Sequence, residues 1–316
     1  MAEFPIDLSG IKTYPLSERK SNVSVQDFGT PWKSGNRYKT FLDTLPNILA
    51  AKDIRNVIAA IYDAYVNHKT IILAMGAHVI KTGLNPIIID LMQRGIISAI
   101  AMNGAGIIHD LEIAMLGKTS EDVSASLGEG AFGMAKETAE FICDAIKNAE
   151  SENSGLGRAV GNKINQAKLP YAAYSLLSTG ATLDIPITVH VAIGTDIIHM
   201  HPDFDASAAG AASHRDFRLF ATMVAKLEGG VHLNIGSAVI LPEVFLKAIT
   251  LTRNLGYPVS RFTTVNMDFI RHYRPETNVV HRPTAHGGKG YSLIGHHEIM
   301  FPIIAAGVIE RITNAP

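Results

Sequence analysis

The chain has 316 residues, of which 47% are hydrophobic and 18% charged, and its formal net charge is −1. The apolar content is ample for a buried sheet with helices packed on it, whereas the near-neutral charge excludes a global field that would attract nucleic acid or an anionic membrane. A single cysteine, Cys143, excludes a disulfide framework, and no apolar window has the length of a membrane span, so a cytoplasmic protein is expected.

Prolines at positions 5, 15 and 31 punctuate a polar, irregular stretch over residues 1–40, which predicts an N-terminal arm. A single domain is expected over residues 41–316, because no repeat or low-complexity linker interrupts them. From Asp53 onward, apolar side chains recur at three- and four-residue steps, the spacing of an amphipathic helix. The continuous apolar run Thr70–Met75 then predicts a strand that is buried on both faces, as in a parallel sheet.

Helices and strands continue to alternate along the chain. Helices are expected over residues 78–94, around residues 141–146, from an N-cap at Ser213 with Asp216 completing a capping box, and from Pro242 to a stop at Gly256. Further strands are expected over residues 97–102, 185–193, 231–235 and 261–265. Such alternation indicates right-handed βαβ units. The predicted fold is a single Rossmann-like α/β domain, with a doubly wound, mostly parallel sheet and helices on both faces.

Glycines and small polar residues follow the predicted strands. In an open parallel sheet, ligands bind outside the carboxyl ends of the strands, where N–H groups of helix N-termini can face a pyrophosphate. A dinucleotide site, and hence NAD, is predicted there, although tight turns favour glycine in any α/β protein. The candidate cofactor-binding residues in these turns are Gly76, Ala77, His78, Asn103, Gly104, Ala105, Gly236, Ser237, Ala238 and Asn266.

A glycine-rich stretch near the end of the chain, His286–Tyr291, contains Lys289, and an apolar run over residues 299–304 follows it. A lysine that is held in a loop against an apolar wall loses solvation, and its neutral amine becomes a nucleophile for carbonyls and imines. A solvated surface lysine in a glycine-rich turn is the alternative.

The histidines raise the question of a metal site. His199 and His201 alternate in sequence, and His296, His297 and Glu298 are adjacent. A catalytic zinc needs three converging protein ligands, but neighbouring residues of a strand point to opposite faces. No metal site is predicted, and a zinc-dependent hydrolase would rest on the number of histidines alone.

Four motifs occur in a fixed order: Gly76–Gly83, Met102–Asp110, Gly194–His199, and Gly287–Lys289 followed by Phe301-Pro302. Jointly they resemble the deoxyhypusine synthase family, and more closely its shorter, deoxyhypusine synthase-like branch, which includes homospermidine synthases. The similarity runs from about Thr70 to Val308.

The resemblance implies an NAD-binding domain that assembles as a homotetramer. It also implies a reaction in which NAD oxidises spermidine, an enzyme lysine holds the aminobutyl group as an imine, and an acceptor amine receives that group. Lys289 matches this lysine, and Asp196 matches an acid that holds a substrate ammonium. His109 stands where the family has a glutamate near the substrate, and His296 where it has an aspartate near the cofactor ribose.

Two family residues are replaced in this chain. Gly287 stands for a tryptophan of the substrate site, and the family's catalytic histidine falls at Pro242 or Glu243, so Glu243 or His286 is the candidate proton shuttle. The expected function is NAD-dependent aminobutyl transfer between small polyamines, with homospermidine synthesis as the favoured form. The alternative is a dinucleotide-binding sensor or assembly subunit without chemistry.

Overall fold

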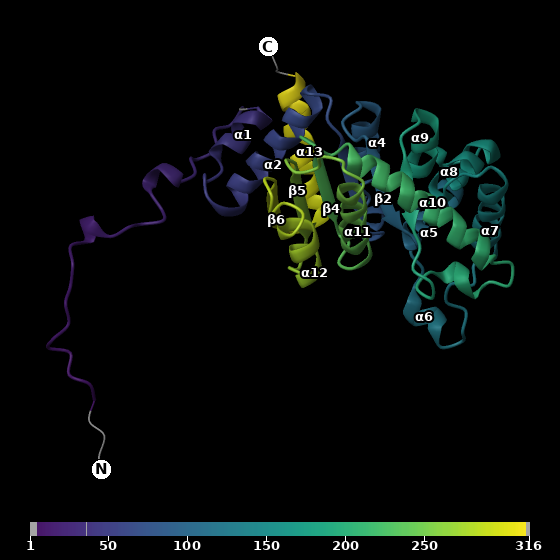
Figure 1. Ribbon diagram of the computed structural model, residues 1–316, viewed down its shortest axis with the longest axis horizontal. Helices are drawn as coiled ribbons and strands as arrows, with labels where there is room; N and C mark the ends of the chain where they lie inside the picture. The colour runs from purple at the N-terminus through teal and green to yellow at the C-terminus, as the bar shows by residue number, and fades with distance from the viewer. Residues whose placement is uncertain (1–4, 36, 314–316) are drawn as a thin grey trace.

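Six parallel strands form one sheet, in the order β3-β2-β1-β4-β5-β6. Figure 1 labels β2, β4, β5 and β6 of this sheet, with helices around them. The computed structural model describes residues 5–35 and 37–313. From β1 the chain winds first to β3 and then, on the other side, to β6, so the predicted doubly wound, Rossmann-like α/β fold is confirmed, with every strand pair parallel. The strands are β1 (Ile71–Met75), β2 (Ala99–Asn103), β3 (Ile187–His190), β4 (Val231–Ile235), β5 (Thr263–Asp268) and β6 (Lys289–Ile294).

Alternate residues of β1 pack into two different cores, which is why this strand reads as a continuous apolar run. Leu73 and Met75 pack in the core that contains α2 and α13, whereas Ile72 and Ala74 pack in the core that contains α11. The longer helices are α1 (Tyr38–Thr44), α2 (Leu49–Val66), α4 (Asn85–Gln93), α5 (Gly104–Leu116), α7 (Lys136–Ser151), α8 (Leu156–Ala167), α9 (Leu176–Leu183), α10 (Ala206–Ala225), α11 (Ile240–Asn254) and α13 (His297–Thr313). Short helical segments are η1 (Leu16–Glu18), η2 (Val25–Asp27), α3 (His78–Lys81), α6 (Val123–Leu127), η3 (Ala172–Tyr174), η4 (Ile197–Met200), α12 (Tyr273–Pro275) and the π-helical η5 (Glu276–His281).

The helix expected over residues 78–94 is in fact two helices. α3 ends at Lys81, Gly83 takes a φ of +79°, and α4 begins at Asn85. A left-handed residue ends a helix at low cost where there is no Cβ. The break reduces α3 to a single turn that directly follows β1.

The cap expected at Ser213 is wrong, because α10 already begins at Ala206, where the Asp205 side chain caps it. Ser213 lies inside this helix, and its Oγ bonds the backbone at the end of β3. Asp216 does not complete a capping box in α10 but accepts hydrogen bonds from the backbone at the start of α8 and in β3. The pattern of a cap is local, whereas the partners of these side chains are distant in sequence.

Lys289 is the first residue of β6 and not part of a loop, which corrects the expectation for the glycine-rich stretch. Its backbone N–H donates to the carbonyl of Phe262 at 3.0 Å, and it pairs in register with Thr263. The adjacent glycine has a packing reason, since a Cβ on Gly290 would lie 2.3 Å from the carbonyl oxygen of Val280 in η5. Glycine therefore lets β6 approach η5 closely.

Residues 5–35 extend away from the body of the molecule (Figure 1), and all of them except Asp27 are exposed. Two backbone hydrogen bonds join their end to the body: the Asn47 N–H donates to the Asp27 carbonyl at 2.9 Å, and the Thr30 N–H to the Thr44 carbonyl at 3.0 Å. None of the helices in the described ranges has both the length and the apolar character of a membrane span.

Candidate active site at the carboxyl edge of the sheet

The strand order reverses between β1 and β4, and the turns that follow these strands meet at the carboxyl edge. Gly76 follows β1 and Gly236 follows β4, and a Cβ on Gly76 would lie 2.1 Å from the carbonyl oxygen of Gly236. Gly236 also has a φ of +64°. Both positions therefore need glycine if the two turns are to approach each other. This is the switch point at which open α/β sheets bind ligands.

A carboxylate of the protein itself, that of Asp196, occupies the turn after β2. Asp196 follows β3 and lies against the N-terminus of α5, where a Cβ on Gly104 would be 1.9 Å from its Oδ2. The Asp196 carboxyl also accepts a hydrogen bond from the backbone of Ala105, and the Asn103 side chain accepts one from the Gly106 N–H at 3.2 Å. Two donors of this predicted cofactor-binding turn are thus engaged within the protein.

The turn after β4 presents a helix terminus to the switch point. Asn234 holds this turn, because its Nδ2 donates to the Ser237 carbonyl at 2.9 Å and to Oδ1 of Asn266 at 2.8 Å. Ser237 Oγ accepts from the Leu241 N–H at 3.2 Å. The N–H groups that open the 15-residue helix α11 have no acceptor within the helix. A pyrophosphate could accept from the N–H groups of this terminus that remain free. Asn266, which accepts from Asn234, is buried below the turn.

A buried histidine and a buried aspartate lie at the same edge, and neither is among the predicted site residues. His297 begins α13 and is 2% exposed, and a Cβ on Gly236 would lie 2.8 Å from its Cε1. Its Nε2 is 3.9 Å from Oδ1 of Asp268, the last residue of β5. The exposed side chain of His78 packs on His297 with ring centroids 5.8 Å apart, and Phe269 adds an aromatic face.

Burial lowers the pKa of His297, although the nearby Asp268 carboxylate acts in the opposite direction. The imidazole is therefore neutral near pH 7, and among the described residues its Nε2 has no hydrogen-bond partner. A neutral imidazole nitrogen that is free of partners and close to a carboxylate is suited to accept a proton.

One carboxylate oxygen of Asp196 also lacks a hydrogen-bond partner among the described residues. The residue is 6% exposed, and this oxygen is Oδ2. Burial raises the pKa of Asp196 to about 6, against the lowering effect of the hydrogen bond from Ala105. The ionised carboxylate is therefore suited to pair with a cation, such as a substrate ammonium.

Lys289, Gly287 and His286 lie at the opposite, amino edge of the sheet. β6 has six residues, so its first residue, Lys289, and its last, Ile294, are about 16 Å apart. Lys289 is exposed and lines a cavity of about 340 Å³ together with residues of α2. Within one chain, a substrate bound at Asp196 cannot also reach the Lys289 amine, so the structure does not bring the predicted lysine and aspartate together.

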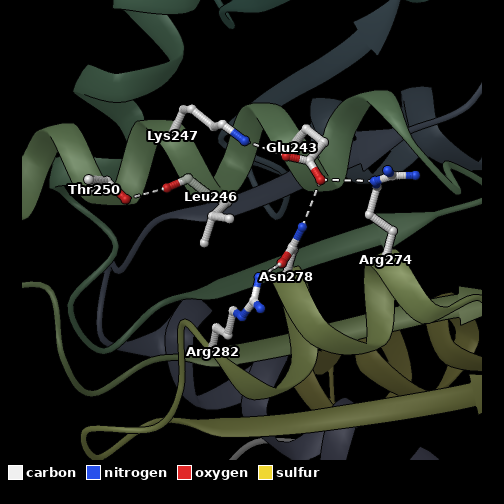
Figure 2. A network of polar contacts seen from close by, with 7 residues as sticks. All are labelled: Glu243, Leu246, Lys247, Thr250, Arg274, Asn278 and Arg282. Atoms are coloured by element: carbon white, nitrogen blue, oxygen red, sulfur yellow. Dashed lines mark hydrogen bonds and ion pairs between the residues drawn. The ribbon is translucent and has the colours of Figure 1, made fainter.

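Glu243, a predicted proton shuttle, is held by cationic side chains (Figure 2). Its Oε1 accepts hydrogen bonds from Arg274 Nε at 3.0 Å and from Asn278 Nδ2 at 2.8 Å, and Lys247 bonds to its Oε2. The hydrogen bond from Lys247 is the main reason that the pKa of Glu243 is lowered. A carboxylate with a lowered pKa is a weak base, and the network instead ties α11 to α12 and η5.

The remaining predicted side chains lie near the carboxyl edge. His109 is tied into a network along α5, with its Nδ1 2.7 Å from Oγ1 of Thr119, which donates to Glu112. His296 is exposed and stacks on Phe269 with the two ring planes 2° apart. His296 and Phe269 therefore offer a flat aromatic surface beside the switch point.

Asp268 and His297 could be recognised only in part from the sequence. The strand predicted over residues 261–265 stops too early, and the observed β5 ends at Asp268, which places this carboxylate at the edge and Asn266 two residues below it. The burial of His297 follows from the packing of α13 over the turn at Gly236, a contact between distant segments for which the sequence has no local signal.

No protein-family model matches the sequence, and no curated protein matches it. Solved structures do share the fold: AgrE in a ternary complex with ornithine and NAD⁺ has a TM-score of 0.53 at 14% identity, over 90% of this chain and 34% of AgrE. A proposed deoxyhypusine synthase from Entamoeba histolytica has a TM-score of 0.51 at 12% identity, over 89% of this chain and 96% of that one. A conserved, proposed LOR/SDH protein from Methanococcus maripaludis S2 has a TM-score of 0.50 at 15% identity, over 89% and 72%. The chain thus spans about a third of the length of AgrE, and at these identities the likeness shows the fold alone.

Proposed function

We propose that this chain is an NAD-dependent enzyme that oxidises an amine and passes the resulting carbon fragment to a second amine. The observation that carries the proposal is the buried His297 beside Asp268 at the switch point, whose Nε2 has no hydrogen-bond partner among the described residues. The N-terminus of α11 adds a place for the cofactor pyrophosphate, and AgrE, which shares the fold, binds ornithine and NAD⁺. Spermidine as donor and putrescine as acceptor, giving homospermidine, is the form that the sequence motifs support.

Each residue at the carboxyl edge has a role in this scheme. When bound, NAD supplies the hydride acceptor for the carbon beside the amine nitrogen. His297 Nε2 takes the proton that leaves the nitrogen, and the Asp268 carboxylate stabilises the imidazolium, while Asp196 pairs with the terminal ammonium of the donor. The acceptor amine would then add to the imine carbon and diaminopropane would leave. The new imine would receive its hydride from the bound cofactor, and His297 would return its proton to the nitrogen.

The acceptor amine attacks directly in this scheme, because Lys289 lies at the opposite edge of the same chain. A covalent imine on Lys289 would need the lysine of a second copy, in an assembly such as the homotetramer that the motifs imply. Borohydride treatment in the presence of NAD and spermidine separates the two routes. We expect no adduct on the protein, whereas an adduct on Lys289 would establish the covalent route.

The first prediction concerns the reaction itself. NAD should raise the melting temperature of the purified protein, because a ligand of the native state stabilises it, and NAD with spermidine and putrescine should yield diaminopropane and homospermidine by mass spectrometry. The Lys289→Arg variant should give the same products at a similar rate. Protein that is not stabilised by millimolar NAD contradicts the proposal, and protein that binds NAD but forms no product supports the sensor or assembly subunit instead.

The second prediction is a pH dependence of substrate binding. Because burial raises the pKa of Asp196 to about 6, its carboxyl is neutral at lower pH and cannot pair with an ammonium. The KM for spermidine should therefore be about tenfold higher at about pH 5 than at about pH 7.5, since the amines stay protonated throughout. Asp196→Asn should raise this KM and remove its pH dependence while the KM for NAD is unchanged. A wild-type KM that does not vary between these pH values would refute the role of Asp196.

A further inference from the structure

A cavity of about 630 Å³ lies away from the carboxyl edge, between α10, α11 and the loop before α8. Its volume is within the range of roughly 300–1,000 Å³ that pockets for small organic ligands have. It is lined by residues from the C-terminal parts of α10 and α11, which lie toward the amino edge of the parallel sheet. The cavity is therefore separate from the proposed active site.

One wall of this cavity is basic. Arg215 and Arg218 of α10 and Lys226, the residue that follows this helix, line it. Arg215 Nε donates to Oδ1 of Asn153 at 2.8 Å, but its Nη1 is buried and has no hydrogen-bond partner among the described residues. The charged groups of Arg218 and Lys226 form no ion pair or hydrogen bond with any of the residues that the structure describes. A buried guanidinium donor that lacks an acceptor is costly, and an anionic ligand would supply one.

The acid in the lining, Asp216, does not neutralise this wall. Its Oδ2 accepts hydrogen bonds from the N–H groups of Gly157 and Val189 at 3.0 and 2.9 Å. The other oxygen, Oδ1, is buried against the backbone of Gly155 and has no hydrogen-bond partner among the described residues. Burial also raises the pKa of Asp216 to about 7, so part of its charge is lost near neutral pH.

The part of the lining that comes from α11 and the segment after it is more apolar. Leu251, Leu255 and Tyr257 lie there, and Leu255 and Tyr257 are 64% and 50% exposed. Exposed apolar and aromatic side chains that face a cluster of cations suit a ligand with a ring at one end and a negative charge at the other. We propose that this cavity binds a small aryl phosphate, with the phosphate at Arg215, Arg218 and Lys226 and the ring against Leu255 and Tyr257. This proposal does not depend on the activity proposed above.

Calorimetric titration with phenyl phosphate tests the site, with inorganic phosphate and phenol as the two halves of the probe. We expect one phenyl phosphate to bind per chain, and each half to bind at least about tenfold more weakly, because both walls contribute. The affinity should fall as salt is added. Inorganic phosphate that binds as tightly as phenyl phosphate overturns the aryl part of the proposal, and an absence of heat at millimolar phenyl phosphate overturns all of it.

A pair of charge reversals locates the binding. The double variant Arg218→Glu/Lys226→Glu should weaken phenyl phosphate binding by at least about tenfold. The double variant Lys52→Glu/Lys147→Glu changes the net charge equally, at exposed positions outside the cavity. It should leave the affinity within about twofold of the parent value. The four residues are all exposed, so both double variants should fold, and circular dichroism checks this. An equal loss of affinity in both double variants would show that net charge, and not the cavity, governs binding.

Discussion

Replacement of His297 by glutamine is expected to lower the rate of amine oxidation by about 10²–10⁴-fold, the usual contribution of a general base. The reason is the geometry of its Nε2, which is buried, unpartnered among the described residues and 3.9 Å from Asp268 Oδ1. Glutamine keeps a polar side chain in the same space but cannot take a proton near neutral pH. The measurement is the steady-state rate of product formation from spermidine and putrescine with saturating NAD.

Two further measurements separate a chemical role from a structural one. The NAD affinity and the melting temperature of His297→Gln should stay close to those of the parent, since the ring is replaced by a group of similar polarity. His281→Gln serves as the matched control, because His281 is exposed on η5, away from the switch point. If His297→Gln retains more than about a tenth of the parent rate, the proton is taken by another group and His297 only packs against Gly236.

The buried strands of this fold could be predicted because burial on both faces leaves a continuous apolar run, as in Ile71–Met75. A ligand site at the carboxyl ends of the strands could be predicted from the glycines that follow such runs, whereas the strand order that places the switch point between β1 and β4 comes from the structure. The physical reason for Gly76 is nevertheless its contact with the carbonyl of Gly236, and that contact joins strands that are far apart in sequence. The same glycine signal would occur with or without a bound dinucleotide.

The error at Lys289 has the same origin. A glycine beside a lysine predicts a loop when only neighbouring residues are considered. Gly290 is instead required because Val280 lies against β6, and so the lysine begins a strand at the amino edge. His297 shows the converse, since its neighbours suggest a polar surface, whereas α13 buries it at the carboxyl edge. Which edge of the sheet a side chain reaches depends on where strands begin and end, and local patterns place these limits poorly.

Two other histidines should make the protein sensitive to acid. His190 in β3 and His232 in β4 are buried, and Phe220 contacts both, with ring centroids 5.4 and 6.3 Å away. The His232 ring also stacks on Phe245 at 3.7 Å, and neither of its nitrogens has a partner among the described residues. Burial lowers the pKa of each histidine to about 3. Both rings are therefore neutral in the folded protein over the whole physiological range.

The sign of the effect follows from proton binding by the unfolded chain. An unfolded histidine has a pKa near 6.5, so as the pH falls below that value the unfolded state takes up protons that the folded state does not. Stability is complete above about pH 6.5 and is lost as the pH falls toward about 3. Between about pH 8 and about pH 5, each histidine should lower the free energy of unfolding by about 2 kcal/mol, and the two together by about 4 kcal/mol. That is a large part of a total stability of about 5–15 kcal/mol.

The variant His232→Phe tests this account, since a phenyl ring fits the stack on Phe245 and carries no nitrogen. At about pH 8 the variant should have a free energy of unfolding about 1 kcal/mol or more above that of the parent, because two buried polar atoms without partners are removed. At about pH 5 this difference, the advantage of the variant, should be larger by about 2 kcal/mol. Urea unfolding at the two pH values gives both differences, with His286→Gln, a change at an exposed histidine, as the control. An advantage that is the same at both pH values would mean that His232 is protonated in the folded state, and that the acid sensitivity arises elsewhere.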